Sequence, residues 1–133
     1  MLIVALCAVY PLLPILSFAM ASIYPDYFCQ TWQRSSVSDL AGYNFEISET
    51  ACDVLAKDDA ITIFASEVGK KEKTAIFKYD PGGDELPRVV AANSGTVRIS
   101  LHSISSIFFR KDVIGSLSIV YDIDHIDYPA AGR

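Results

Sequence analysis

Apolar and polar residues alternate with a period of two along most of this chain, and this alternation constrains the fold more than any other feature. Successive side chains of a β-strand point to opposite faces, so the pattern is typical of strands with one buried face. The strand-like stretches are residues 43–48, 61–65, 74–79, 88–92, 97–102 and 117–123. Turn residues separate them, and no crossover helix of adequate length lies between them, which excludes a parallel α/β fold. The sequence predicts a mainly β protein, a small antiparallel β-sandwich or barrel of about six strands.

The alternation also predicts which side chains form the core. The inner face is expected to hold Tyr43, Phe45, Ile47, Ile61, Ile63, Ala65, Ala75, Phe77, Tyr79, Val97, Ile99, Leu101, Leu117, Ile119, Tyr121 and Ile123. The Gly- and Lys-rich link at 69–73 predicts a hairpin, and the serines at 105–106 predict a bulge or corner. With such a corner we expect Ile107, Phe108 and Phe109 all to enter the core. A strand with one wet face would instead expose an aromatic ring and indicate a partner surface.

The start of the chain has the pattern of a secretory leader. Residues 2–21 carry no charge, and Ala19–Ala21 supply the A-x-A pattern that precedes signal-peptide cleavage. Pro11 and Pro14 disfavour a lone membrane-spanning helix, because each removes a backbone donor and no neighbouring helix compensates. We therefore expect residues 1–21 to be a signal peptide, with a retained membrane anchor as the alternative.

The remaining residues, 22–133, are expected to form a single β domain outside the cytoplasm, either periplasmic or secreted. They begin with a segment that lacks alternation. Tyr27, Phe28 and Trp32 fall near helical spacing, which favours a short helix or turn ahead of the sheet. Residues 34–42 are polar enough to be a connection.

The cysteines agree with export. Removal of the leader takes Cys7 with it and leaves Cys29 and Cys52, an even number in an oxidising compartment. A disulfide between them closes a loop that stabilises the fold by roughly 3.4 kcal/mol in the chain-entropy model. The alternative is two buried free thiols. The sequence has no CxxC motif and no Cys/His spacing typical of structural zinc.

The charge distribution excludes some partners. The formal net charge is −5 at pH 7, which disfavours nucleic acids and anionic lipids, so we expect membrane contact only through residues 1–21. The sequence has one basic spot, where Lys70, Lys71 and Lys73, followed by Lys78, could face anionic headgroups or an acidic partner. The alternative is that these lysines are solvated at a hairpin tip and protect a sheet edge.

The segment YDIDHIDY is the densest polar cluster. Its candidate metal ligands are Asp122, Asp124, His125 and Asp127. A continuous strand would divide them between its two faces, which favours a charged edge strand over a metal site. His102 and His125 are the histidines available as bases for a small hydrolase, but no G-x-S-x-G motif accompanies them. No phosphate-binding glycine loop is present, and we expect no cofactor.

These features favour a binding or structural role at the cell envelope over catalysis. A secreted inhibitor or immunity-type protein that neutralises a basic enzyme is the first alternative, and a hydrolase using His102 or His125 is the second. A negative surface patch around the loop at residues 80–87 would favour the inhibitor. A cleft that holds a histidine with a perturbed pKa would favour the hydrolase.

Overall fold

The computed structural model describes residues 29–53, 57–83 and 85–128. The predicted leader and its cleavage site lie outside these residues, as do Tyr27 and Phe28. None of the described residues belongs to a helix long and apolar enough to cross a membrane. The prediction of one domain over residues 22–133 stays a prediction.

The chain divides into two compact units. The smaller unit contains residues up to 30 and 51–58, and its described part holds a disulfide between Cys29 and Cys52, 23 positions apart. The disulfide predicted from the cysteine count is therefore present. The larger unit contains residues 31–50 and 59–133 and holds the hydrophobic core.

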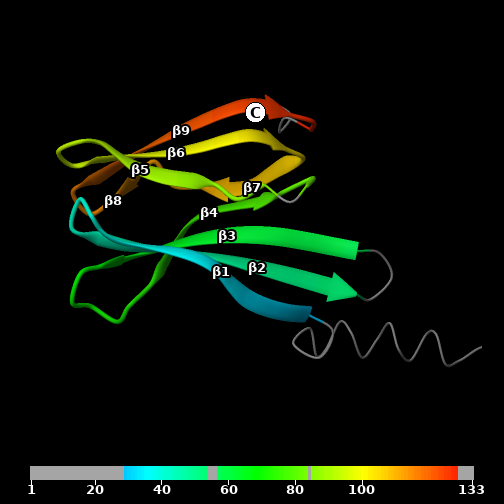
Figure 1. The fold of residues 1–133 in the computed structure, drawn as a ribbon, viewed down its shortest axis with the longest axis horizontal. Helices are drawn as coiled ribbons and strands as arrows, with labels where there is room; N and C mark the ends of the chain where they lie inside the picture. Colours follow the sequence, from blue (N-terminus) through cyan, green and yellow to red (C-terminus); the bar gives the residue numbers. More distant parts are fainter. Residues whose placement is uncertain (1–28, 54–56, 84, 129–133) are drawn as a thin grey trace, which may run out of the picture. The chain divides into compact units, whose positions relative to one another are not determined.

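The described residues form nine strands in two sheets, so the predicted mainly β sandwich is confirmed (Figure 1). The strands are β1 (Cys29–Leu40), β2 (Tyr43–Asp53), β3 (Lys57–Glu67), β4 (Thr74–Asp80), β5 (Arg88–Asn93), β6 (Thr96–Ile104), β7 (Ser106–Arg110), β8 (Val113–Ile114) and β9 (Leu117–Ile126). The larger sheet has the order β1-β2-β3-β4-β7, and the smaller sheet has the order β5-β6-β9-β8.

The core confirms most of the alternation, but Ile76, between the predicted core residues Ala75 and Phe77, is also 0% exposed, because the register of β3 and β4 shifts between Ile63 and Phe64. The core takes side chains from both sheets, and among those fully covered are Ile63 and Phe77 of the larger sheet and Val97 and Ile99 of the smaller one, each 0% exposed. The predicted hairpin around residues 69–73 joins β3 to β4, which pair antiparallel. The predicted corner is also present, because the chain leaves β6 at Ile104 and enters β7, in the other sheet, at Ser106.

One strand pair departs from the antiparallel prediction. β6 and β9 run parallel, from Thr96 opposite Ser118 to Ile104 opposite Ile126. Two short strands, β7 and β8, form the connection between them in place of a helix. The rule that parallel strands need a long crossover holds for this pair, but the crossover is itself made of strand.

The prediction of a helix or turn followed by a polar connection was wrong for the described part of that segment. Residues 29–40 form β1, a long edge strand beside β2, and only Ala41 and Gly42 make the turn. Pairing with β2 supplies the backbone partners that a short isolated helix would lack, and such tertiary pairing overrides a faint helical spacing. The number of strands rises from about six to nine because β1, β7 and the two-residue β8 were not anticipated.

The prediction that residues 107–109 all enter the core was also wrong. Ile107 packs against the core, but Phe108 is 52% exposed and Phe109 is 36% exposed. The register between β4 and β7 shifts between Lys78 and Tyr79, so Phe108 is an extra residue opposite no partner. A bulge of this kind lets two consecutive side chains turn outward.

Candidate functional site

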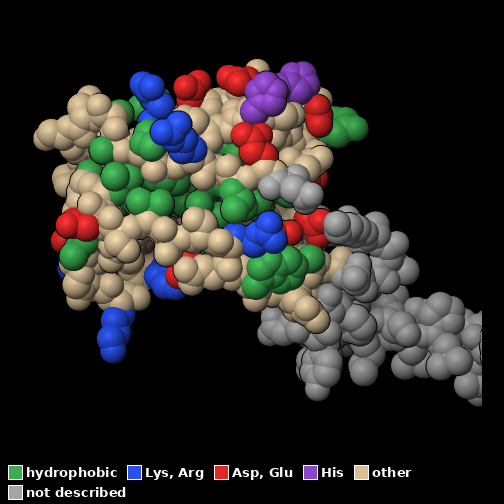
Figure 2. All heavy atoms as spheres, in the orientation of Figure 1, with side chains coloured by type: hydrophobic (Ala, Val, Ile, Leu, Met, Phe, Trp, Pro, Cys, Tyr) green, Lys and Arg blue, Asp and Glu red, His purple; other side chains and the backbone are tan. Residues whose placement is uncertain are grey.

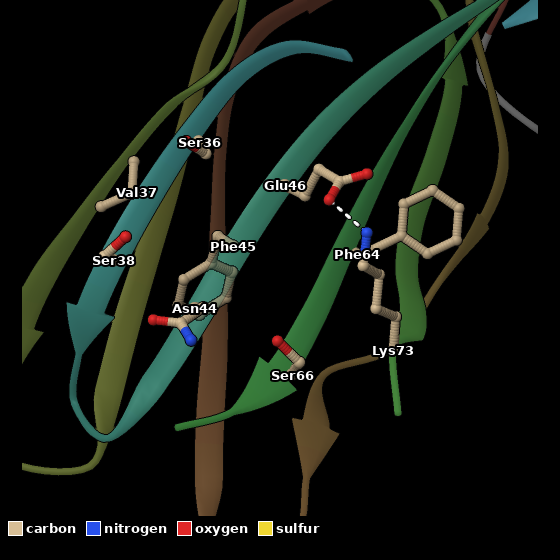
Figure 3. A pocket seen from close by; sticks show the side chains of 9 residues that line it. All are labelled: Ser36, Val37, Ser38, Asn44, Phe45, Glu46, Phe64, Ser66 and Lys73. Atoms are coloured by element: carbon tan, nitrogen blue, oxygen red, sulfur yellow. Dashed lines mark hydrogen bonds and ion pairs between the residues drawn. The ribbon is translucent and has the colours of Figure 1, made fainter. Parts of the chain in front are cut away.

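A small hollow lies on the outer face of the larger sheet, and we call it the serine hollow (Figure 3). Its volume is about 80 Å³, which is the space of a few water molecules. Its lining combines polar and apolar side chains and consists of Ser36, Val37, Ser38, Asn44, Phe45, Glu46, Phe64, Ser66 and Lys73. A hollow of this size accepts one small group of a ligand, and the rest of the ligand has to lie across the sheet.

Strand alternation explains why these side chains converge. Val37 of β1 packs on the core, so Ser36 and Ser38 on either side of it point outward. The same rule turns Asn44 and Glu46 of β2 outward around buried Phe45, and Phe64 and Ser66 of β3 outward around buried Ala65. The hollow is therefore a direct consequence of three adjacent strands that bury their intervening residues.

The charges that line the serine hollow are paired with each other. Lys73 donates to the Glu46 carboxylate, as the dashed line in Figure 3 marks, and the Ser48 hydroxyl donates to the same carboxylate over 3.2 Å. The Asn44 side-chain oxygen accepts a hydrogen bond from the backbone N–H of Asp39 over 2.9 Å. The groups left to meet a ligand are the serine hydroxyls, the Asn44 amide and the Phe64 ring, which together suit an uncharged polar group.

Beside the hollow, the same sheet face carries an aromatic row formed by Lys78, Phe108 and Phe109. Lys78 of β4 lies opposite Phe109 of β7, so the row spans these two strands, and Thr62 of β3 lies on the other side of Lys78. The Lys78 ammonium nitrogen lies 5.8 Å from the centre of the Phe108 ring, within the range of a cation–π contact. Lys78 has no carboxylate within 4.0 Å among the described side chains.

The structure separates the three lysines of the predicted basic spot. Lys73 lines the serine hollow, whereas Lys70 lines a second hollow of about 260 Å³ and pairs with Glu67. The hydrogen bond and charge of Glu67 raise the pKa of Lys70. Lys71 is exposed and has no carboxylate partner within the described part of the chain. Their role as a partner surface stays a prediction.

The two histidines lie at one end of the smaller sheet, where Figure 2 shows them (purple) among acidic side chains (red). The parallel pairing of β6 with β9 brings His102 to Asp124, with 2.9 Å between Nδ1 and Oδ2. The hydrogen bond and charge of Asp124 raise the pKa of His102. His125 pairs with Asp127 over 3.2 Å between Nε2 and Oδ1. We call this region the histidine end.

The proposed metal ligands therefore lie in separate pairs at the histidine end. Asp124 pairs with His102 and Asp127 with His125, and Asp122 is exposed on β9 two positions before Asp124. Among residues 29–53, 57–83 and 85–128, no group of three or more His, Cys, Asp or Glu side chains is arranged to hold a metal ion. Neither histidine lines the serine hollow or the second hollow, so the structure brings neither into a cleft that it describes.

The sequence did not single out the serine hollow. The outward positions of Phe64 and Ser66 followed from the alternation of β3, but Ser36 and Ser38 fell in a segment expected to be a connection. No protein-family model, curated protein or solved structure matches the chain. We therefore infer the function from the side chains exposed on the two sheets.

Proposed function

We propose that this protein is a binding module outside the cytoplasm and that the outer face of its larger sheet holds the ligand. The observation that carries the proposal is the serine hollow next to the aromatic row. Hydroxyl and amide groups, aromatic rings and an ion pair converge on one small space, which is a mixture of groups typical of ligand sites. Exposed Phe108 and Phe109 beside it leave apolar area uncovered, which is typical of interaction sites.

A location outside the cytoplasm has separate support. The Cys29–Cys52 disulfide fits an oxidising compartment, where such bonds persist. The A-x-A pattern at Ala19–Ala21 supports export through a cleaved leader. An envelope or secreted ligand is therefore the natural target of the binding face.

Binding is favoured over catalysis by the placement of the titratable groups. Glu46 and Lys73 of the serine hollow form an ion pair with each other. His102 is exposed, and its raised pKa comes from an ion pair with Asp124 at the surface. A general base works best where a reacting group can be held beside it and water is excluded.

Filling the serine hollow tests the proposal. Ser38→Trp places a large ring on the exposed outer face of β1, and Ser118→Trp places the same ring on the exposed outer face of β9 as the matched control. The measurement is the fraction of purified protein that sediments with cell envelopes of the producing organism. We expect the wild type and Ser118→Trp to sediment and Ser38→Trp to remain in solution. Equal sedimentation of all three would contradict the proposed site.

A second candidate, the inhibitor of a basic enzyme, has one specific observation in its favour. Glu85, in the loop after β4 where an inhibitor would carry a negative patch, lies near the histidine end, because it accepts a hydrogen bond from the backbone N–H of His102 over 3.4 Å. Asp122 and Asp124 lie on the same part of the surface. If this patch is the binding site, Glu85→Gln with Asp124→Asn removes inhibition of a basic target enzyme while Ser38→Trp leaves inhibition unchanged.

A further inference from the structure

The unpaired groups on the outer face of the larger sheet define what the ligand has to offer. The serine hollow can accept a small hydrogen-bonding group of the ligand, because the charged side chains of the hollow are paired with each other. The exposed rings of Phe108 and Phe109 can pack against a flat apolar face of the ligand. The Lys78 ammonium group can pair with an anionic group of the ligand, because no described carboxylate lies within 4.0 Å of it.

These groups are too far apart for one small molecule to satisfy. Phe64 lies on β3 and Phe109 on β7, and β4 lies between these strands. Adjacent strands are about 4.8 Å apart, so β3 and β7 are about 10 Å apart. The part of the serine hollow on β1 and β2 lies beyond this span. A ligand that meets all three requirements must extend across the sheet as a chain.

We propose that this face binds a polysaccharide that carries carboxylate groups. The inference rests on the proposed function and names its ligand class. A pyranose ring has a face of C–H bonds that can lie on Phe108 or Phe109 and an edge of hydroxyls that can enter the serine hollow. A carboxylate on the same chain pairs with Lys78, which the Phe108 ring already holds on the sheet face at 5.8 Å.

Lys78 gives this face a cation with which an anionic ligand can pair. The whole chain has a net charge of −5, so a polyanion is repelled by most of the surface. Lys78 has no carboxylate partner in the described structure, whereas Lys70 and Lys73 pair with Glu67 and Glu46. Binding should weaken as salt rises, because Lys78 is at the surface.

An acidic peptide is the competing ligand, and the serine hollow argues against it. The hollow, at about 80 Å³, is too small for the large aromatic and arginine side chains by which peptides are usually anchored. The hydroxyls of Ser36, Ser38 and Ser66 match the repeating hydroxyls of a sugar chain. The chemistry of the hollow therefore decides between two ligands that Lys78 and the phenylalanines alone do not distinguish.

Gel electrophoresis of the purified protein through three immobilised polymers tests the proposal. The probes are polygalacturonate, which has sugar rings and carboxylates, dextran, which has sugar rings alone, and polyglutamate, which has carboxylates alone. We expect polygalacturonate to retard the protein and the other two polymers to retard it at least about tenfold less at equal concentration. Added salt should weaken the retardation.

Two variants with matched controls locate the site. Phe108→Ala should weaken binding to polygalacturonate by about two- to tenfold, and Lys78→Gln by a similar factor. Val120→Ala and Arg98→Gln make the same kinds of change at exposed positions of the smaller sheet and should leave binding unchanged. All four positions are at least partly exposed, and a thermal melt of each variant verifies that the fold is retained.

The other outcomes overturn the inference in distinguishable ways. Equal retardation by dextran means that the face binds sugars without selecting carboxylates, which leaves the proposed function intact. Equal retardation by polyglutamate means that charge alone drives binding and that an acidic protein is the partner. No retardation by any polymer, with envelope sedimentation still lost in Ser38→Trp, rejects the ligand class but keeps the binding face. No retardation and no effect of Ser38→Trp rejects both.

Discussion

Two core tyrosines provide a sharp test of the structure, because the same chemical change at each is expected to have opposite effects. Tyr79 is 0% exposed, and its hydroxyl has no hydrogen-bond partner among the described residues. Tyr121 donates its hydroxyl hydrogen towards the backbone oxygens of Ile76, at 3.1 Å, and Lys111, at 2.7 Å. Replacing each tyrosine by phenylalanine removes one oxygen and leaves the ring in place.

The magnitudes follow from what each hydroxyl contacts. A buried hydroxyl without a partner costs about 1–3 kcal/mol of desolvation, so Tyr79→Phe should raise the free energy of unfolding by about that amount. The ring contact with Phe77, at 4.9 Å between centroids, is kept. Tyr121→Phe should lower the free energy of unfolding by about 1–1.5 kcal/mol. The loss is limited because the Ile76 oxygen also accepts from the backbone N–H of Lys111 over 2.7 Å.

Thermal and urea unfolding followed by circular dichroism measure both changes. A shift of about 4 °C in Tm accompanies each kcal/mol in a domain of this size. We expect Tyr79→Phe to melt higher than wild type and Tyr121→Phe to melt lower. Tyr43→Phe is the control, because its hydroxyl reaches the Ile114 oxygen only over 3.4 Å and the change should stay within about 0.5 kcal/mol. If Tyr79→Phe is destabilised as much as Tyr121→Phe, the Tyr79 hydroxyl has a partner and the reasoning fails.

The same two residues predict the response to alkali. Burial raises the pKa of Tyr121 to about 12 and raises the pKa of Tyr79 as well. A tyrosine in the unfolded chain ionises near pH 10, so above that pH the unfolded state holds fewer protons than the folded state. Stability should therefore be constant below about pH 10 and fall as pH rises towards 12. Tyr79→Phe should make the free energy of unfolding fall less steeply with pH above about pH 10. Urea unfolding at a series of pH values measures this slope.

Three further predictions concern the core, the disulfide and the leader. Ile99→Asp buries a carboxylate at a position that is 0% exposed and should abolish folding, whereas Thr62→Asp on the outer face should leave a cooperative melt; identical melts would mean that the strand register is wrong. Cys29→Ser combined with Cys52→Ser should lower stability by roughly 3.4 kcal/mol in urea unfolding, and thiol titration of the non-reduced, unfolded wild type should find no free thiol at these positions. Intact-mass measurement of exported protein should give a chain that begins after Ala21, and a mass that includes the leader indicates an anchor.

The sequence predicted the fold class well, because successive side chains of a strand alternate between a buried face and an exposed face. Phe45, Ile63 and Ile99 were assigned to the core from spacing alone, and all three are buried. The corner at 105–106 was also predictable, because two serines interrupt an otherwise long apolar alternation. Each of these signals depends on residues close together in the chain.

The parts that were missed depend on partners far away in the chain. β1 is a strand because β2 lies beside it, and nothing within residues 29–40 records that neighbour. Phe108 is exposed because of a register shift opposite Lys78, about thirty positions earlier, which no local pattern can reveal. The ion pair between His102 and Asp124 likewise needs the parallel register of β6 and β9.

The serine hollow was missed for the same reason. Three separate strands supply its lining, and each contributes small polar residues that are ordinary on any sheet surface. Ser36 and Ser38 became informative only once β1 was placed next to β2. A site of this kind is visible in the arrangement of strands and not in a motif.

The position of β9 has a consequence for when the protein can fold. It is the last of the nine described strands in chain order, yet it lies inside the smaller sheet between β6 and β8. Until residues 117–126 have left the ribosome, β8 has no strand to pair with and β6 lacks a neighbour on one side. The smaller sheet is therefore incomplete until these last residues are made, and the growing chain stays open until then. A translocation channel that accepts only unfolded polypeptide would meet it in that state, and a chain cut short before residue 117 should be degraded rapidly.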